Sequence, residues 1–456
     1  MKSETHLKLC SCCLVLFSVS LAIGCSGSSS VQGTAPTTSP VPAVLSVTIS
    51  PQSLELKHGE SAKFSASVAN SSDASVTWSI QEGSAGGTIT DAGVYTAPAV
   101  DGVYHVVATP KADTTKSGTA SISVIPEIFT PTGNLTTRRS WHTATLLPNG
   151  RVFIAGGLSS NPQSTLADQA EQFNPATGTF QPDGRFSGVL NSATVLANGD
   201  VLIAGGAIDW STRTSTNSAF LLKSGSGILQ PTGNMIAARY GHTATLLQDG
   251  RVLITGGATP SVTATAELYD PVSGTFAPAG NMSASRVFHT ATLLASGKVL
   301  VTGWWRSAEL YDPATNSFNE TGSMAADRFS YTATLLPDGK VLIAGGETDY
   351  DVVYAGATQI YDPGTSQFTP AGEMLTPRWG HTATLLPNGT VLFAGGDVDA
   401  SDIPTAGTEI FRPDTSSFTR GPTMSHGRVL HTATLLPDGS VLVVGGAADN
   451  SAEIYK

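Results

Sequence analysis

Cysteine is nearly absent from this chain of 456 residues. The four cysteines are Cys10, Cys12, Cys13 and Cys25, so the sequence beyond residue 25 contains none. At most one thiol would remain after removal of an N-terminal leader, which excludes a disulfide framework. The folded regions must be stabilised by the burial of apolar side chains instead.

Charged side chains are also scarce. They make up 13% of the residues and leave a net formal charge of -11, whereas glycine and proline contribute 48 and 26 residues. This composition is typical of a turn-rich all-β protein and argues against long helices and against a disordered chain held open by charge. Because an acidic surface repels phosphate groups, we do not expect nucleic acid as a partner.

The N-terminal apolar run, residues 9–23, is too short for a comfortable membrane span. It follows Lys2 and Lys8 and predicts a signal peptide over residues 1–24. The run ends in Leu-Ala-Ile-Gly followed by Cys25, which resembles a bacterial lipoprotein signal. This resemblance implies that Cys25 is acylated and anchors the protein to a bacterial membrane outside the cytoplasm, at the outer membrane or cell surface. The alternative is an ordinary cleaved signal with an incidental cysteine.

The next two segments differ in composition. Residues 25–44 are mainly small, uncharged residues with proline, which predicts a flexible tether. Residues 45–126 contain short stretches of alternating apolar and polar residues, such as residues 76–80 and 103–108, the pattern of strands in a sandwich. We expect Trp78 to lie in the core. Residues 93–98 resemble bacterial immunoglobulin-like repeats, which implies an N-terminal Ig-like β-sandwich.

Residues 127–456 form a repeat array. One phrase recurs at intervals of 42 to 51 residues. It begins with a stretch of the type His-Thr-Ala-Thr-Leu-Leu and continues with a glycine turn such as Asp249-Gly250, a short apolar run and usually Gly-Gly. Each copy predicts an inner strand of small residues, a second strand before the glycines, a third that ends at a turn such as Asp-Pro, and a fourth with an apolar, mostly aromatic residue. The Asp-Gly type of turn predicts two-residue hairpins with positive φ. The seven phrases begin at His142, Asn191, His242, His289, Tyr331, His381 and His431.

The strand count predicts how the array closes. First, second and third strands occur seven times, but only six fourth strands follow their copies. Residues 128–134 repeat the Pro-Thr-Gly-Asn phrase of residues 231–234 and supply the missing strand. We therefore predict a seven-bladed propeller in which residues 128–134 complete the last blade beside residues 452–455, leaving no open sheet edge.

The repeated diglycine and aromatic pattern resembles Kelch repeats and the propeller domain of galactose oxidase, over residues 128–456. In that family copper is held by two histidines and two tyrosines, one of them cross-linked to a cysteine. The adjacent Tyr-His ligand pair of the family falls nearest to Phe288-His289, and phenylalanine offers no phenolate. With no cysteine beyond residue 25 the family cofactor cannot form, so the resemblance implies the fold without the activity, and we expect no cofactor.

Two kinds of polar residue recur with the repeat. An arginine stands three residues before most phrases, and a Glu or Gln stands in most third strands, whereas blade two has Gly188 and Ala219 in these slots. Their joint loss predicts that Arg and Glu pair inside each blade, bidentately. We expect the five phrase histidines to satisfy backbone groups, because a seven-fold ring holds most of them too far apart for one metal ion. The arginines are Arg139, Arg239, Arg286, Arg328, Arg378 and Arg428, and their partners are Glu171, Glu267, Glu309, Gln359, Glu409 and Glu453.

The loops after the diglycines carry most of the variation, and variable loops on a rigid scaffold are common binding sites. Aromatic side chains beside charged ones suit sugars or protein partners. The candidates are Asp209, Trp210, Arg213, Trp304, Trp305, Arg306, Tyr350 and Tyr354. Weaker candidates for a calcium site are Asp397, Asp399 and Asp402, and likewise Glu347, Asp349 and Asp351, although no complete ligand loop is present.

We find no Ser-His-Asp arrangement and no phosphate-binding glycine loop, and we assign no catalytic residue. The sequence favours a surface-anchored, non-catalytic recognition or adhesion protein that binds a carbohydrate or protein ligand on the variable-loop face. The alternative is a carbohydrate-active enzyme of the isomerase, lyase or hydrolase type with a site built from loops.

Overall fold

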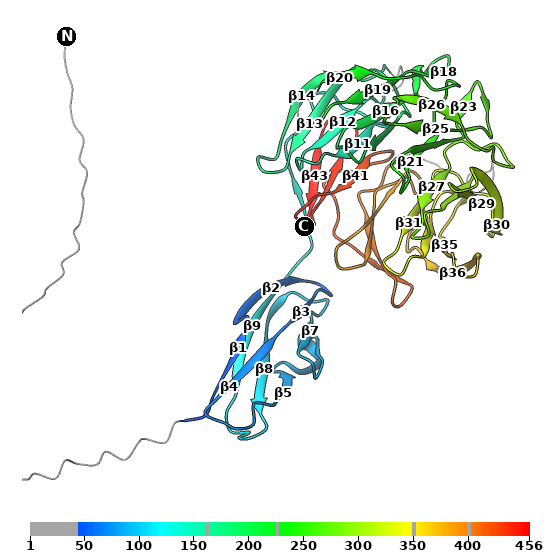
Figure 1. Ribbon diagram of the computed structural model, residues 1–456. Coiled ribbons are helices and arrows are strands. Elements are labelled where there is room, and N and C mark those ends of the chain that lie inside the picture. The colour runs from blue at the N-terminus through cyan, green and yellow to red at the C-terminus, as the bar shows by residue number, and fades with distance from the viewer. Residues whose placement is uncertain (1–43, 160–164, 225–227, 349–352, 399–402) are drawn as a thin grey trace, which may run out of the picture.

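Figure 1 shows the computed structural model, which describes residues 44–159, 165–224, 228–348, 353–398 and 403–456. The predicted leader, Cys25 and the tether up to residue 43 lie outside the described residues. The regular structure of the described residues consists of β-strands and one short 3-10 helix, Gly83–Gly86. No helix among them has the length and hydropathy needed to cross a membrane.

An N-terminal β-domain comes first in the chain. It comprises β1 (Ser46–Ser50), β2 (Ser53–Lys57), β3 (Ser61–Lys63), β4 (Ser65–Ala69), β5 (Val76–Ile80), β6 (Thr88–Ile89), β7 (Val94–Thr96), β8 (Gly102–Pro110) and β9 (Gly118–Ile125). A sheet ordered β2-β9-β8-β5 shares one apolar core with the smaller sheets β1-β4 and β3-β7-β6. The aromatic side chains at its centre are Phe64 and Tyr95, and Trp78, expected in the core, is half-buried and packs against the margin of this core.

The rest of the described chain folds into a seven-bladed β-propeller of four-stranded antiparallel sheets (Figure 1). Blade one has β11 (Thr143–Leu146), β12 (Val152–Ala155), β13 (Gln169–Asn174) and β14 (Thr179–Arg185). Blade two has β15 (Ser192–Val195), β16 (Val201–Ala204), β19 (Ala219–Leu222) and β20 (Leu229–Pro231). Blade three has β21 (Thr243–Leu246), β22 (Val252–Thr255), β25 (Ala266–Asp270) and β26 (Thr275–Pro278).

Blade four has β27 (Thr290–Leu293), β28 (Val299–Gly303), β29 (Trp305–Asp312) and β30 (Ser317–Ser323). Blade five has β31 (Thr332–Leu335), β32 (Val341–Ala344), β35 (Ala357–Asp362) and β36 (Gln367–Glu373). Blade six has β37 (Thr382–Leu385), β38 (Val391–Ala394), β39 (Thr408–Arg412) and β40 (Ser417–Arg420). Blade seven has β41 (Thr432–Leu435), β42 (Val441–Val444) and β43 (Ala452–Tyr455), with β10 (Phe129–Pro131) as its outer strand.

The second strands explain why the blades pack into a ring. Every residue of β12 is buried, and alternate side chains face opposite neighbours. Val152 and Ile154 pack against blade seven, whereas Phe153 and Ala155 pack against blade two. A strand covered on both faces is expected to be apolar throughout, as these are. The inner strands contact one another in a closed cycle, with β11 meeting β41.

The ring is closed by the strand that joins the two domains. β10 pairs antiparallel with β43, with Phe129 opposite Tyr455 and their rings 5.3 Å apart. Further backbone hydrogen bonds link Ile128 with Lys456 in both directions, at 3.0 and 3.1 Å. Residues from opposite ends of the chain therefore share one sheet.

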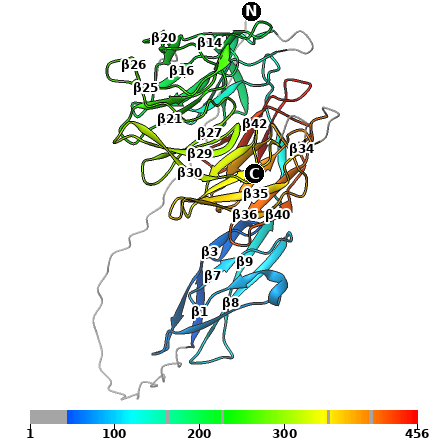
Figure 2. The ribbon, with the colours of Figure 1, turned by 90° about the vertical axis from the view of Figure 1, so that its right-hand side faces the viewer.

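The direction of the strands defines two faces of the propeller. The turns between first and second strands and between third and fourth strands lie on one face, here called the turn face. The longer connections lie on the other, the loop face. An outer strand begins at the turn face, so the N-terminal β-domain, which ends three residues before β10, lies on that side (Figures 1 and 2). Lys57 Nζ is 5.9 Å from the Tyr455 ring across this contact. The loop face consequently points away from the N-terminal β-domain.

The inner turns differ in one detail from the prediction. Gly150 and its six equivalents have positive φ, but the Asn, Asp or Ser residues that precede them do not. In blade one, Leu147 N donates to Arg151 O and Gly150 N to Leu147 O, which is a type I turn followed by a left-handed glycine. The prediction of two-residue hairpin turns was therefore wrong, although the glycines are required.

Candidate functional site on the loop face

The centre of the loop face is built from the residue just before each phrase, in a set called here the axial ring. All seven members have left-handed backbone, with φ between 50° and 62°. Six of the seven successive pairs are joined by a backbone hydrogen bond, such as Trp141 N to Leu430 O at 3.0 Å. The members are Trp141, Leu190, Gly241, Phe288, Ser330, Gly380 and Leu430, and none carries a charge.

Small ring members make room for large ones. A Cβ atom on Gly241 would lie 3.1 Å from the Phe288 ring, and one on Gly380 would lie 3.2 Å from Leu430. Phe288 and Leu430 therefore each lean over the preceding glycine of the ring. Half-buried Trp141, Leu190, Phe288 and Leu430 give the mouth of the axis an apolar lining.

Trp210 extends this apolar surface. It follows β17 (Ala207–Asp209) in a hairpin completed by β18 (Thr214–Ser215). Its ring lies 4.9 Å from that of Trp141 and 6.0 Å from that of Tyr240, both edge to face. Trp141, Trp210, Tyr240, Phe288 and Trp304 belong to one apolar cluster, called here the axial cluster. The cluster brings together two of the predicted loops, those of blades two and four.

Trp304 occupies an unusual place in the repeat. It stands where the other blades have the second glycine of the diglycine, and it adopts φ of +70°. Because β28 and β29 are joined directly at this point, with Gly303 opposite Trp305, the loop of blade four is short. The indole of Trp304 packs 4.9 Å from Phe329. A shortened loop therefore places an aromatic ring beside the axis.

The polar candidates lie around this cluster. The Asp209 carboxylate accepts hydrogen bonds from Ser211 N and Oγ at 2.9 and 2.7 Å, and these bonds hold the pKa of Asp209 below its ordinary value. Asp209 therefore shapes the hairpin, and exposed Arg213 lies 5.8 Å from the Trp210 ring. Trp305 is 45% exposed, and its indole donates to Ser285 O at 3.2 Å. Arg306 is exposed on the same strand.

The remaining candidates do not form a site among the described residues. Tyr350, Asp349, Asp351, Asp399 and Asp402 lie outside them, as does the side chain of Tyr354, which ends β34 (Val353–Tyr354). Asp397 is buried, and its backbone pairs with Trp379 in both directions; Glu347 pairs likewise with Phe329. Within the described ranges, no three His, Cys, Asp or Glu side chains gather as a metal site would require.

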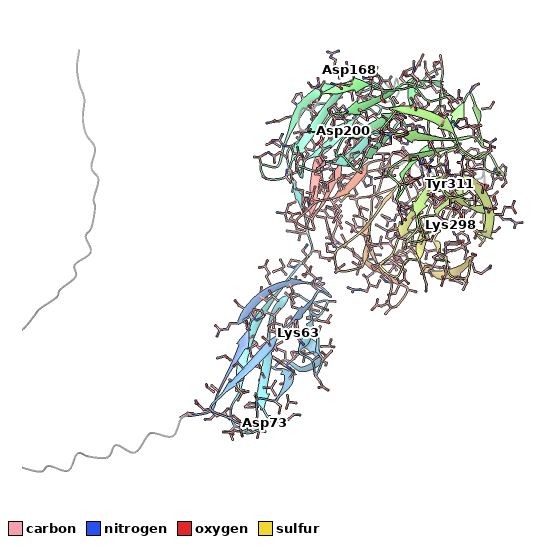
Figure 3. All side chains as sticks on the ribbon, in the orientation of Figure 1. Lys63, Asp73, Asp168, Asp200, Lys298 and Tyr311 are labelled. Atoms are coloured by element: carbon pink, nitrogen blue, oxygen red, sulfur yellow. The ribbon has the colours of Figure 1, made fainter. Side chains whose placement is uncertain are left out.

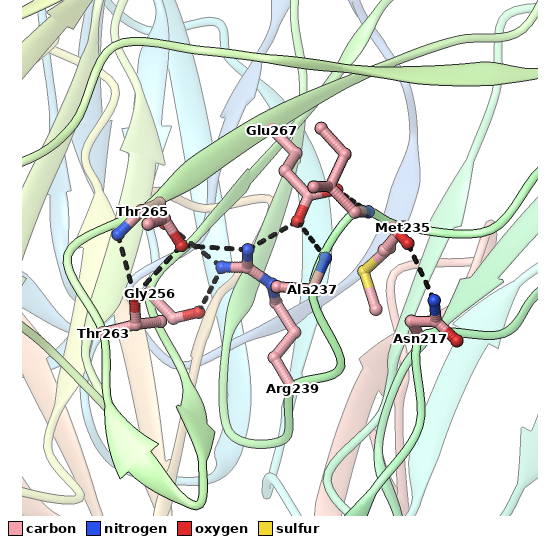
Figure 4. A network of polar contacts seen from close by, with 9 residues as sticks. Asn217, Met235, Ala237, Arg239, Gly256, Thr263, Thr265 and Glu267 are labelled. Carbon is pink, nitrogen blue, oxygen red and sulfur yellow. Dashed lines mark hydrogen bonds and ion pairs between the residues drawn. The ribbon is translucent and has the colours of Figure 1, made fainter.

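The repeated arginines pair with glutamates inside five blades, as predicted. In blade three, Arg239 Nη2 lies 2.6 Å from Glu267 Oε1, and both side chains are buried (Figure 4). The pair is not bidentate, however, because Glu267 Oε2 accepts from Ile236 N at 2.7 Å and Arg239 Nη1 donates to Gly256 O. The prediction of bidentate pairs was wrong, because the second carboxylate oxygen and the second terminal guanidinium nitrogen bond backbone groups instead. Each pair thus ties the entering loop to the blade.

Two blades depart from this pattern. In blade five, Gln359 Oε1 accepts from Ala325 N at 3.1 Å, and Arg328 donates to Ala357 O in place of a carboxylate. In blade two, the strand register sets Phe220 opposite Ile203, so Phe220 fills the glutamate slot and the assignment of Ala219 was wrong. Phe220 packs edge to face on Phe186, with ring centroids 6.2 Å apart. An aromatic pair has replaced the ion pair there.

The phrase histidines serve the packing between blades. We expected these histidines to satisfy backbone groups, but their Nε2 atoms bond hydroxyls of the preceding blade, as His142 does with Thr432 Oγ1 at 2.9 Å. Burial, followed by the nearby Arg239 charge, lowers the pKa of His242 to about 3. Asn191 of blade two is too short to continue this series, and both polar atoms of its side chain are buried without a partner.

The sequence did not single out the axial ring. Its members include Trp, Leu, Gly, Phe and Ser, so they share a backbone conformation and no side-chain type. The available signal was their position, directly before each phrase.

Comparisons with known proteins support the fold. No protein-family model and no curated protein matches the sequence. Among solved structures, the chain is similar to a fungal alcohol oxidase of the AA5 family in complex with copper, with a TM-score of 0.61 and 18% identity. The match covers 73% of this chain and 76% of that chain. The predicted Kelch-type propeller fold is thereby confirmed, and at this identity the match shows the fold alone.

The residues of the axis do not fit the copper of that relative. His289 Nε2 is engaged with Thr255 Oγ1 at 2.9 Å, and the side chain of the adjacent ring member, Phe288, has no oxygen to offer a metal. The other phrase histidines bond hydroxyls in their own interfaces between blades. We therefore derive no copper chemistry for this chain.

Proposed function

We propose that this protein is a non-catalytic recognition protein that binds a carbohydrate at the axial cluster on the loop face. The observation that carries the proposal is the aromatic surface formed by Trp141, Trp210, Phe288 and Trp304 around an axial ring without charge. The apolar faces of sugar rings pack well on such aromatic surfaces, and exposed Arg213, beside the Trp210 ring, supplies directional donors at the edge of the cluster.

The order of the chain supports a role at the cell surface. We propose that acylated Cys25 anchors the protein to a bacterial membrane, and that the tether and an Ig-like spacer hold the propeller away from it. Because the N-terminal β-domain lies on the turn-face side, the loop face would face the surroundings. A protein ligand is the second class that such a surface fits, since interfaces are rich in Trp and Arg.

Glycan-array binding with the recombinant mature chain tests this proposal. We expect Trp210→Ala to weaken binding at least about tenfold, because a central aromatic residue typically contributes about 2 kcal/mol. Trp305→Ala is the matched control, since this exposed indole lies outside the axial cluster, and it should leave affinity nearly unchanged. Equal loss in both variants would refute the assignment to the axial cluster, and turnover of the bound glycan would refute a non-catalytic role.

A further inference from the structure

The space between blades one and two differs from the other gaps between blades on the turn face. In six blades an aromatic pair from the third and fourth strands fills this position, with ring centroids 4.8 to 5.3 Å apart. Blade two has Leu222 opposite Leu229 instead. The pairs are Phe173–Phe180, Tyr269–Phe276, Tyr311–Phe318, Tyr361–Phe368, Phe411–Phe418 and Phe129–Tyr455.

The opposite wall of the same gap has also changed. Gln172 of β13 lies opposite Phe153 in the register, a position held by Leu or Ile in the other six blades. Its Nε2 donates to Asp183 Oδ2 at 2.7 Å. Polar side chains have thus replaced apolar ones on the wall that faces the missing aromatic pair.

A cavity of 510 Å³ occupies this space. It extends past the turns to Gln172, Gln181 and Asp183 on the outer strands of blade one and to buried Leu222. The hollows at the equivalent places between blades four and five, of 340 Å³, and between blades five and six, of 460 Å³, are lined within the propeller by residues of the turns and strand ends alone. The deeper cavity follows from the two changes described above.

The polar groups of the cavity are balanced in charge. Lys223 Nζ is 2.8 Å from Asp200 Oδ2 (Figure 3 labels Asp200). The Arg151 guanidinium has no hydrogen bond or ion pair to any described residue, and the Asp183 carboxylate, which accepts from Gln172, lines the same cavity. Asn149 and Gln181 add amides, which both donate and accept.

We propose that this cavity is a second binding site, for a neutral saccharide of one or two rings. Sugar hydroxyls both donate and accept hydrogen bonds. They therefore suit a cavity whose amides, guanidinium and carboxylate offer both kinds of group and whose charges balance. The apolar floor of Leu147, Pro148 and Leu222 suits the C–H faces of a sugar ring. The volume is within the usual range of small-molecule sites, roughly 300–1,000 Å³. This site is independent of the axial cluster, which lies on the opposite face.

Ligand-observed NMR with the mature chain and maltose, cellobiose, lactose and N,N′-diacetylchitobiose tests the proposal. We expect at least one disaccharide to bind, and Leu222→Tyr with Leu229→Phe to abolish its binding by restoring the aromatic pair of the other blades. Arg151→Ala should weaken binding at least about tenfold, the loss expected for a charged hydrogen bond of about 1.5–3 kcal/mol. The Arg151 guanidinium has no partner among the described residues, so this variant tests the site without disturbing the core.

Trp210→Ala serves as the control that separates the two sites. It should leave disaccharide binding in the cavity unchanged even if it abolishes glycan binding on the loop face. Failure of all four disaccharides to bind, or undiminished binding by the Leu222→Tyr/Leu229→Phe variant, would overturn this assignment.

Discussion

Removal of the Glu267 carboxylate should cost more stability than loss of its hydrogen bonds alone. Glu267 accepts from Arg239 Nη2 at 2.6 Å, from Ile236 N at 2.7 Å and from Ala237 N at 3.0 Å. In Glu267→Ala the Arg239 guanidinium would stay buried with carbonyl partners but without a countercharge. Breaking one side of a buried ion pair costs about 3–5 kcal/mol, so we expect a loss of that size in the free energy of unfolding.

The protein contains its own control for this experiment. Gln359 fills the same slot in blade five, where Arg328 Nη1 and Nη2 donate to carbonyl groups, so Gln359→Ala removes one hydrogen bond and no countercharge. That variant should cost about 1 kcal/mol. Glu267→Gln, which reproduces the blade-five arrangement in blade three, should fall between the two.

Denaturant unfolding followed by tryptophan fluorescence would measure these differences. A double-mutant cycle combines Arg239→Met with Glu267→Ala. The double variant should be more stable than the sum of the two single losses predicts, because no unpaired charge remains buried. The reasoning would be refuted if the two losses were additive, or if Glu267→Ala cost no more than Gln359→Ala.

Three further predictions concern the packing of the ring. The unfolded chain takes up protons at its histidines below a pH of about 6.5, whereas burial holds the pKa of four phrase histidines near 3, so their contribution to stability is complete above pH 6.5 and falls as the pH drops. At pH 5.5 each of these histidines should lower the free energy of unfolding by about 1.4 kcal/mol relative to its value above pH 6.5. Equal melting temperatures at pH 7.5 and pH 5.5 would contradict this. Asn191→His should reach Thr143 and raise the unfolding free energy by about 1 kcal/mol, as urea titration can show; a lower value would mean that the gap is too small. Deletion of residues 453–456 removes most of the partner strand of β10 and should lower the melting temperature by several degrees or cause aggregation, whereas an unchanged melt would count against closure by β10.

Much of the propeller could be predicted from the sequence because each blade repeats its strands and its turns. The pairing of β10 with β43 follows from counting strands, and the Arg–Glu pairs follow from their joint loss in blade two. The register of β19 was harder to predict, because its sequence Ala-Phe-Leu-Leu is not followed by the proline turn that aligns five of the other six blades. Only the hydrogen-bonded pairing with β16 places Phe220 in the glutamate slot.

Both candidate sites were less accessible to prediction. The axial ring depends on left-handed backbone, which Trp141 and Gly241 share although their side chains have nothing in common. The cavity arises where residues depart from the repeat, and a search for recurring patterns passes over such departures. Gln172 and Leu222 lie 50 positions apart, so their meeting across one gap follows from the packing of blades and not from sequence spacing.

The strand that closes the ring is also the link to the N-terminal β-domain. A pull on that domain, directed away from the propeller, would act along β10 from the end at which the strand enters blade seven. Two antiparallel strands that are pulled along their length resist by shear. The hydrogen bonds between Ile128 and Lys456 and those between β10 and β43 would then be strained together and not opened one after another. Tension on the chain would therefore meet the resistance of a whole strand pair before the first blade could separate from the last.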